Sequence, residues 1–180
     1  MKPLQIFSTA NILTILRVVL TPLIIISEIR ERSVLSFVIF GLIGTSDVFD
    51  GLLARWTGND NRFGAVFDLA ADFFVIFSLF LLFYWKGIFP LLLLIFAFLS
   101  AVTFCLNCLA KKGLSKNTIG QYTGAVLFGG VLTYFFVRLF LKDLYAPALR
   151  VIIAASLIYL AISIIENIVI LFKRLKSNIL

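Results

Sequence analysis

Long apolar stretches alternate with short polar breaks along the whole chain. Each stretch is long enough to cross a bilayer, because about 20 helical residues span its roughly 30 Å hydrocarbon core. No break is long enough to hold a separate domain. The pattern therefore predicts one all-α domain over residues 1–180 with six transmembrane helices. They are expected near Asn11–Ile29, Val34–Arg55, Phe63–Trp85, Ile88–Ala110, Thr118–Leu141 and Ala146–Phe172.

The composition also indicates an integral membrane protein. Hydrophobic residues make up 62% of the chain and charged residues 14%, and the mean hydropathy is +1.10. A soluble domain carries about 25% charged residues. The formal charge is +7, but most Lys and Arg residues lie between apolar stretches, where they set membrane topology. The charge is thus not taken as a sign of nucleic-acid binding.

The basic residues predict the orientation in the membrane, because cytoplasmic loops carry the excess of Lys and Arg. One side has nine of them and the other six, so we expect both termini to be cytoplasmic. The first side holds Lys2, Arg55, Arg62, Lys111, Lys112, Lys116, Lys173, Arg174 and Lys176. The second holds Arg30, Arg32, Lys86, Arg138, Lys142 and Arg150. The short length favours a prokaryotic cytoplasmic membrane.

Acidic residues gather in one segment, since five of the nine carboxylates lie within residues 46–72. Asp47 and Asp50 are three residues apart in the second predicted helix, and Asp68 and Asp72 are four apart in the third. Both spacings place the members of a pair on one helical face. The short connection makes the two helices antiparallel neighbours. The four carboxylates can therefore converge in a cavity at the cytoplasmic side.

Four such carboxylates would repel one another or take up protons unless a cation lies among them. Oxygen ligands suit Mg²⁺, Mn²⁺ or Ca²⁺, and the chain has no histidine. The usual partner of two such ions in a pocket is a phosphate. As an alternative, single aspartates near helix ends can be solvated or pair with Arg55. Acids inside apolar helices, however, are functional by default.

The acidic segment resembles a family signature. Asp47-x-x-Asp50-Gly51-x-x-Ala54-Arg55, eight residues, then Gly64-x-x-x-Asp68-x-x-x-Asp72, matches the pattern of the CDP-alcohol phosphotransferases without a departure. Eight fixed positions coincide by chance on the order of once in 10⁹–10¹⁰ starts. Asn11-x-x-Thr14-x-x-Arg17 also resembles the first helix of bacterial members. The predicted helices and length fit the family along the whole chain.

The resemblance implies a reaction in phospholipid biosynthesis. Such enzymes move a phosphatidyl or similar group from a CDP-linked lipid to an alcohol hydroxyl and release CMP. Asp47, Asp50, Asp68 and Asp72 would hold two divalent ions, usually Mg²⁺ or Mn²⁺. Asp72 would also be the general base for the acceptor hydroxyl. A homodimer is expected from the family.

The resemblance also implies a nucleotide site. Gly51, Ala54 and Arg55 would line the cytidine diphosphate together with Asp47, and Gly64 would lie close by. Two alternatives stay open. The small residues also allow close packing of membrane helices, and Arg55 can be a topology-setting basic residue.

The acceptor site is predicted from scattered polar residues. Arg17, six residues into the first helix, could face an acceptor phosphate or extend to the interface. Lys111, Lys112 and Lys116 could bind the same phosphate, although topology alone explains them. Asn107 could bind hydroxyls or make a plain hydrogen bond between helices.

The identity of the acceptor stays open. The subfamily patterns for glycerol phosphate, inositol phosphate and serine acceptors are missing, so glycerol 3-phosphate is only the best guess. Inositol phosphate, serine and a neutral polyol are alternatives, and the donor could be diacylglycerol-based or an ether lipid. A divalent-cation transporter would also need acids in the membrane. It would be expected to distribute them along a path.

Overall fold

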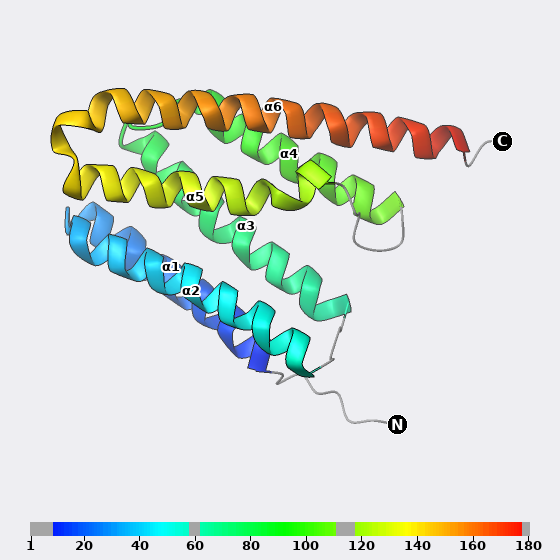
Figure 1. Cartoon of the computed structure of the whole chain (residues 1–180), viewed down its shortest axis with the longest axis horizontal. Coiled ribbons are helices and arrows are strands. Elements are labelled where there is room, and N and C mark those ends of the chain that lie inside the picture. The colour runs from blue at the N-terminus through cyan, green and yellow to red at the C-terminus, as the bar shows by residue number, and fades with distance from the viewer. Residues whose placement is uncertain (1–8, 58–61, 111–117, 178–180) are drawn as a thin grey trace. The chain divides into compact units, whose positions relative to one another are not determined.

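The computed structural model describes residues 9–57, 62–110 and 118–177, and all of its secondary structure in these ranges is helical. This confirms the all-α prediction. Figure 1 shows the helices in chain order. They are α1 (Thr9–Ile29), α2 (Ser33–Thr57), α3 (Arg62–Trp85), α4 (Leu91–Ala110), α5 (Thr118–Phe140) and α6 (Tyr145–Ser177), with a short 3₁₀ helix, η1 (Lys142–Leu144), before α6.

The predicted helix bounds agree with the structure to within about two residues at all but two places. One is the end of α6, which lies at Ser177 rather than at Phe172, and the other is near Ile88. There α4 begins at Leu91 rather than at Ile88. Gly87 ends α3 with a φ of +69°, a conformation that glycine adopts without steric cost. The Gly87 N–H donates to the Tyr84 carbonyl at 2.9 Å and the Ile88 N–H to the Phe83 carbonyl at 2.8 Å. These two bonds form a Schellman turn, which satisfies the last carbonyls of the helix.

The chain forms two compact units, Met1–Ser78 and Leu79–Leu180, and the boundary lies inside α3. The prediction of a single domain over 1–180 stays a prediction. In the first unit, α1 packs along α2 (Figure 1). Their connection turns at Glu31, which has a φ of 57°. Beside the turn, the buried hydroxyls of Ser27 and Ser36 are 2.7 Å apart and join the two helices.

In the second unit, α4 and α5 each pack against α6 (Figure 1). Gly130 in α5 faces α6, and a Cβ there would make an ordinary van der Waals contact with the Ser156 Oγ at 3.5 Å. An aromatic cluster of Phe83, Phe89 and Tyr134 fills the core where α3 ends and α5 nears its end. The Phe83 and Tyr134 ring centroids are 4.7 Å apart, and those of Phe83 and Phe89 are 5.1 Å apart.

The surface is unusually apolar, and polar side chains lie inside. Val34, Val151 and Phe172 are 66%, 67% and 69% exposed. Soluble proteins rarely expose large apolar patches of this kind. Among the described residues, two helical segments are long and apolar enough to cross a membrane, 122–140 and 142–173. Both features are typical of a membrane protein. Six spans and cytoplasmic termini stay predictions.

Candidate active site

The acidic motif lies on two helices, as the sequence predicted. Asp47 and Asp50 are in α2, and Asp68 and Asp72 are in α3. Because both segments are helical, residues three or four positions apart lie on the same helix face. Of these four side chains, only that of Asp72 belongs to the described part of the structure. The side chains of Asp47, Asp50, Asp68, Ala54 and Arg55, and the surroundings of Gly51 and Gly64, lie outside it.

An ion pair joins α1 to α3 at the last aspartate of the motif. The Arg17 Nη1 donates to the Asp72 Oδ1 at 2.6 Å, across 55 positions of sequence. The Arg17 side chain is fully buried, whereas that of Asp72 is 36% exposed. The Arg17 guanidinium therefore lies inside the protein. A hydrogen bond between two ionised groups is about twice as strong as a neutral one, so the pair fixes the position of the carboxylate.

Asn107, a predicted acceptor residue, makes a hydrogen bond between two helices. It is fully buried, and its Nδ2 donates to the Asn167 backbone carbonyl in α6 at 2.7 Å. The Asn167 Oδ1 lies 3.3 Å from the same nitrogen. These contacts favour the packing alternative for Asn107, and a role in acceptor binding stays a prediction. Lys111, Lys112 and Lys116 lie outside the described residues.

Two partners are not evident from the sequence, namely Asp72 as the partner of Arg17 and Asn167 as the partner of Asn107. A signal for the second was present, because Ser163 and Asn167 are four residues apart in an apolar stretch. That spacing marks a polar helix face, and the Asn167 Nδ2 lies 3.5 Å from the Ser163 Oγ.

Comparison with protein-family models identifies the family of the chain. The model described as CDP-alcohol phosphatidyltransferase matches residues 7–172. The chain belongs to the CDP-alcohol phosphatidyltransferase family. This confirms the resemblance of the motif and makes the protein a phosphotransferase that transfers a phosphatidyl group. Comparisons with curated proteins and with solved structures found no match.

The residues of this phosphatidyltransferase fit the divalent metals that its family generally uses. The motif offers only carboxylate oxygens, the ligands that Mg²⁺ and Mn²⁺ prefer. Asp72 is partly exposed and so is accessible from outside the protein. A carboxylate has two oxygens, so the bond from Arg17 to Oδ1 does not by itself prevent coordination or proton uptake at Oδ2.

Proposed function

We propose that the protein transfers a phosphatidyl or related lipid-phosphate group from a CDP-linked lipid, such as CDP-diacylglycerol, to a polar alcohol. Glycerol 3-phosphate is the preferred acceptor, with inositol phosphate, serine or a neutral polyol as alternatives. The observation that carries the proposal is the complete acidic motif on α2 and α3, within a family match over residues 7–172.

The four aspartates would hold two divalent cations, Mg²⁺ or Mn²⁺. When bound, these cations neutralise the pyrophosphate of the donor and stabilise the charge that develops on its oxygens. Asp47, Gly51, Ala54, Arg55 and Gly64 would form the nucleotide site. Small residues at these positions would leave room for a nucleotide beside the helix backbone, and a guanidinium such as that of Arg55 suits a diphosphate.

Asp72 would be the general base. Its carboxylate accepts the proton of the acceptor hydroxyl as that oxygen bonds to the phosphatidyl phosphorus. The bond from this phosphorus to the bridging oxygen breaks, and CMP leaves with the electron pair. General base catalysis of this kind contributes about 10²–10⁴-fold. The proposal is supported by the partial exposure of Asp72 and by the 2.6 Å bond that holds its Oδ1.

Arg17 is proposed to position Asp72 and to attract an acceptor phosphate. The contact with Asp72 supports the first role. The second role, which Lys111, Lys112 and Lys116 would share, rests on charge alone. The protein is further proposed to be a multi-pass protein of a prokaryotic cytoplasmic membrane, to form a homodimer, and to open its site to the cytoplasm.

The test is CMP release from CDP-diacylglycerol by the purified protein, with each candidate acceptor in turn. We expect release with one acceptor, dependent on Mg²⁺ or Mn²⁺ and lost in EDTA. Restoring the metal should restore the activity. If the folded protein neither binds CDP-diacylglycerol nor releases CMP with any acceptor, the proposal is wrong. A cation transporter would then be the alternative, and metal flux into proteoliposomes would test it.

A further inference from the structure

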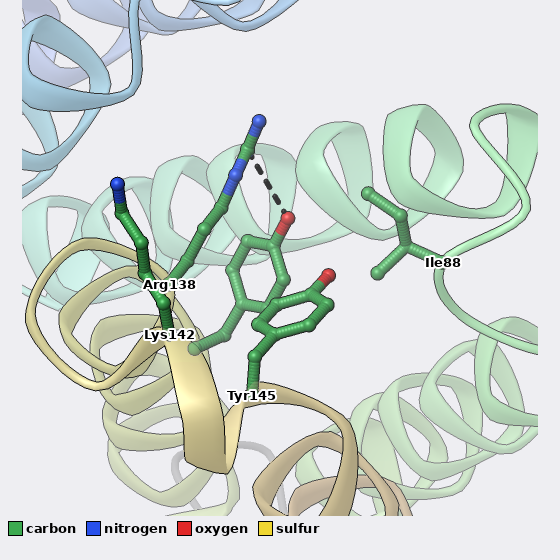
Figure 2. Close-up of a pocket in the computed structure, with 5 residues that line it drawn as sticks. Ile88, Arg138, Lys142 and Tyr145 are labelled. Carbon is green, nitrogen blue, oxygen red and sulfur yellow. Dashed lines mark hydrogen bonds between the residues drawn. The ribbon is translucent and has the colours of Figure 1, made fainter.

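A cavity of about 320 Å³ lies in the second unit, away in sequence from every residue of the acidic motif. Its described lining is Ile88, Tyr134, Arg138, Lys142 and Tyr145. Figure 2 shows Arg138 and Lys142 extending along one side and Ile88 on the other. Ligand sites in proteins usually begin at about 300 Å³. The cavity is therefore large enough for a small headgroup.

The walls of the cavity are held in place by the core. Tyr134 is only 1% exposed, and its ring packs against those of Phe83 and Phe89. The Tyr145 ring centroid lies 6.1 Å from that of Tyr134. The Schellman turn at Gly87 fixes Ile88, which comes directly after it. The lining is thus preformed, which lowers the entropic cost of binding.

The polar groups of the lining are suited to an anion. The Arg138 Nη1 donates to the Tyr134 Oη at 3.2 Å, and the guanidinium carbon lies 6.0 Å from the centre of the Tyr134 ring (Figure 2). This contact holds the guanidinium at the cavity. Lys142 adds an exposed ammonium group, and the described lining includes no carboxylate. Asp143 is exposed on η1 beside Lys142 in the sequence but does not line the cavity.

Residues close in sequence to the cavity lining are of the types found at a membrane surface. Trp85 ends α3 with 77% of its surface exposed, and Tyr84 before it is 41% exposed. Phe140 and Leu144, which lie on either side of Lys142 in the sequence, are 62% and 55% exposed. Trp and Tyr gather where membrane helices reach the headgroup region, and the lipid phosphates lie there too. This setting favours a lipid as the source of the anion.

We propose that this cavity is a phosphate-binding site, and that Arg138 and Lys142 bind the phosphate of an anionic lipid headgroup or free phosphate. Ile88 and the two tyrosine rings would contact the apolar part of a lipid. The aspartates Asp68 and Asp72 lie in the first half of α3, and the cavity follows its end. The lining of the cavity thus includes no residue of the acidic motif. It is independent of the proposed reaction.

The test measures thermal unfolding of the full chain in detergent micelles, with added phosphatidylglycerol, phosphatidylcholine or inorganic phosphate. Phosphatidylglycerol should raise the midpoint, because a ligand that binds only the folded state stabilises it. Arg138→Gln and Lys142→Gln should each raise the half-maximal lipid concentration, by about tenfold for Arg138→Gln. Lys142 is exposed, so its variant is expected to fold even if Arg138→Gln does not.

Two controls separate this site from other effects. Lys86→Gln removes a basic residue near the end of α3 that does not line the cavity. Phosphatidylglycerol should shift the unfolding midpoint of this variant as it shifts that of the unchanged protein. Asp72→Asn should also respond normally, which separates the cavity from the donor site. An equal shift with inorganic phosphate, lost in the same variants, would identify free phosphate as the ligand. The proposal is wrong if phosphatidylcholine stabilises equally, if Lys142→Gln responds normally, or if no ligand shifts the midpoint.

Discussion

The two compact units both bury serine hydroxyls, but among the described residues only the first buries charged side chains as well. Among the described side chains of the first unit, Arg17 and Glu28 are charged types with no exposed surface. In the second unit the buried polar side chains of the described residues are all neutral, namely Ser100, Asn107, Ser156, Ser163 and Asn167. Both units face the same requirement, because polar groups inside an apolar bundle need partners. Among the described residues, the second unit uses hydroxyls and amides, whereas the first has hydroxyl contacts such as Ser27 with Ser36 and, in addition, the ion pair of Arg17 with Asp72.

The difference indicates what each set of groups does. Neutral side-chain hydrogen bonds between membrane helices contribute about 0.6 kcal/mol on average, and they demand little desolvation. A buried ion pair costs several kcal/mol of desolvation per ion and is weak evidence for stability. Arg17 is fully buried and Asp72 is 36% exposed, and we propose that the pair serves to position Asp72 for catalysis. The Asn107–Asn167 contact is adequately explained by packing.

The largest effect is expected from Asp68→Asn in the first unit. If Asp68 binds metal as proposed, its loss should lower CMP release by more than about 100-fold, because mutating even the residues that support metal ligands lowers activity by about 10–100-fold. The measurement is CMP release at saturating Mg²⁺. Asp143→Asn, which changes an exposed aspartate on η1, is the matched control and should keep full activity. Full activity in Asp68→Asn would remove this residue from the site.

Arg17→Gln should lower both activity and stability. Activity is expected to fall by about 10–100-fold, because the Asp72 carboxylate loses the group that positions it. The free energy of unfolding should fall by about 1–3 kcal/mol through the lost charge-assisted bond. Enzyme kinetics and unfolding in detergent with added denaturant measure the two effects.

A double-mutant cycle with Asp72→Asn tests whether the pair acts as a unit. Residues in contact show coupling energies of about 0.5–3 kcal/mol, so the two stability effects should not add. Arg150→Gln, at an exposed arginine in α6, is the control and should change neither quantity. Strict additivity of Arg17→Gln and Asp72→Asn would contradict the assigned contact.

Asn107→Ala should lower stability without changing acceptor affinity. The lost bond to α6 is expected to cost about 1 kcal/mol, within the range for such bonds between membrane helices. The KM for the acceptor should stay within about twofold, because the Asn107 side chain bonds to α6 rather than to the acceptor. A tenfold rise in this KM with unchanged stability would instead establish Asn107 as an acceptor residue.

The smallest effect is expected from Ser163→Ala. The Ser163 Oγ lies 3.2 Å from the Ser100 Oγ and 3.0 Å from the Thr123 Oγ1, so one hydroxyl links α6 to both α4 and α5. Its loss should cost about 0.5–1 kcal/mol of unfolding free energy. Activity should not change. Thr133→Val, at an exposed position whose hydroxyl bonds within its own helix, is the control. A large loss of activity in Ser163→Ala would show that the neutral network also serves catalysis.

The helices and the acidic motif could be predicted from the sequence, because both depend on local spacing. Apolar length gave the six helices to within a few residues, and the start of α4 was misplaced only because the Gly87 turn interrupts an apolar stretch. The motif could be recognised because its eight positions are fixed along two helices.

The contacts between helices could not be predicted in the same way. Arg17 meets Asp72 across 55 positions and Asn107 meets Asn167 across 60, and such pairings depend on helix rotation and depth. Sequence spacing within one helix does not determine either quantity. The cavity lined by Arg138 and Lys142 could not be predicted for the same reason, because residues from three separate segments of the chain form it. The basic residues there had indicated only membrane topology.

The most direct test of the central claim is CMP release by Asp72→Asn beside the unchanged protein. The substitution keeps the shape of the side chain while removing its ability to accept a proton. We expect a loss of at least about 100-fold, the lower end for general base catalysis, in a protein that remains folded and still binds CDP-diacylglycerol. CMP release at the rate of the unchanged protein would show that Asp72 is not the base and that the ion pair with Arg17 serves the fold.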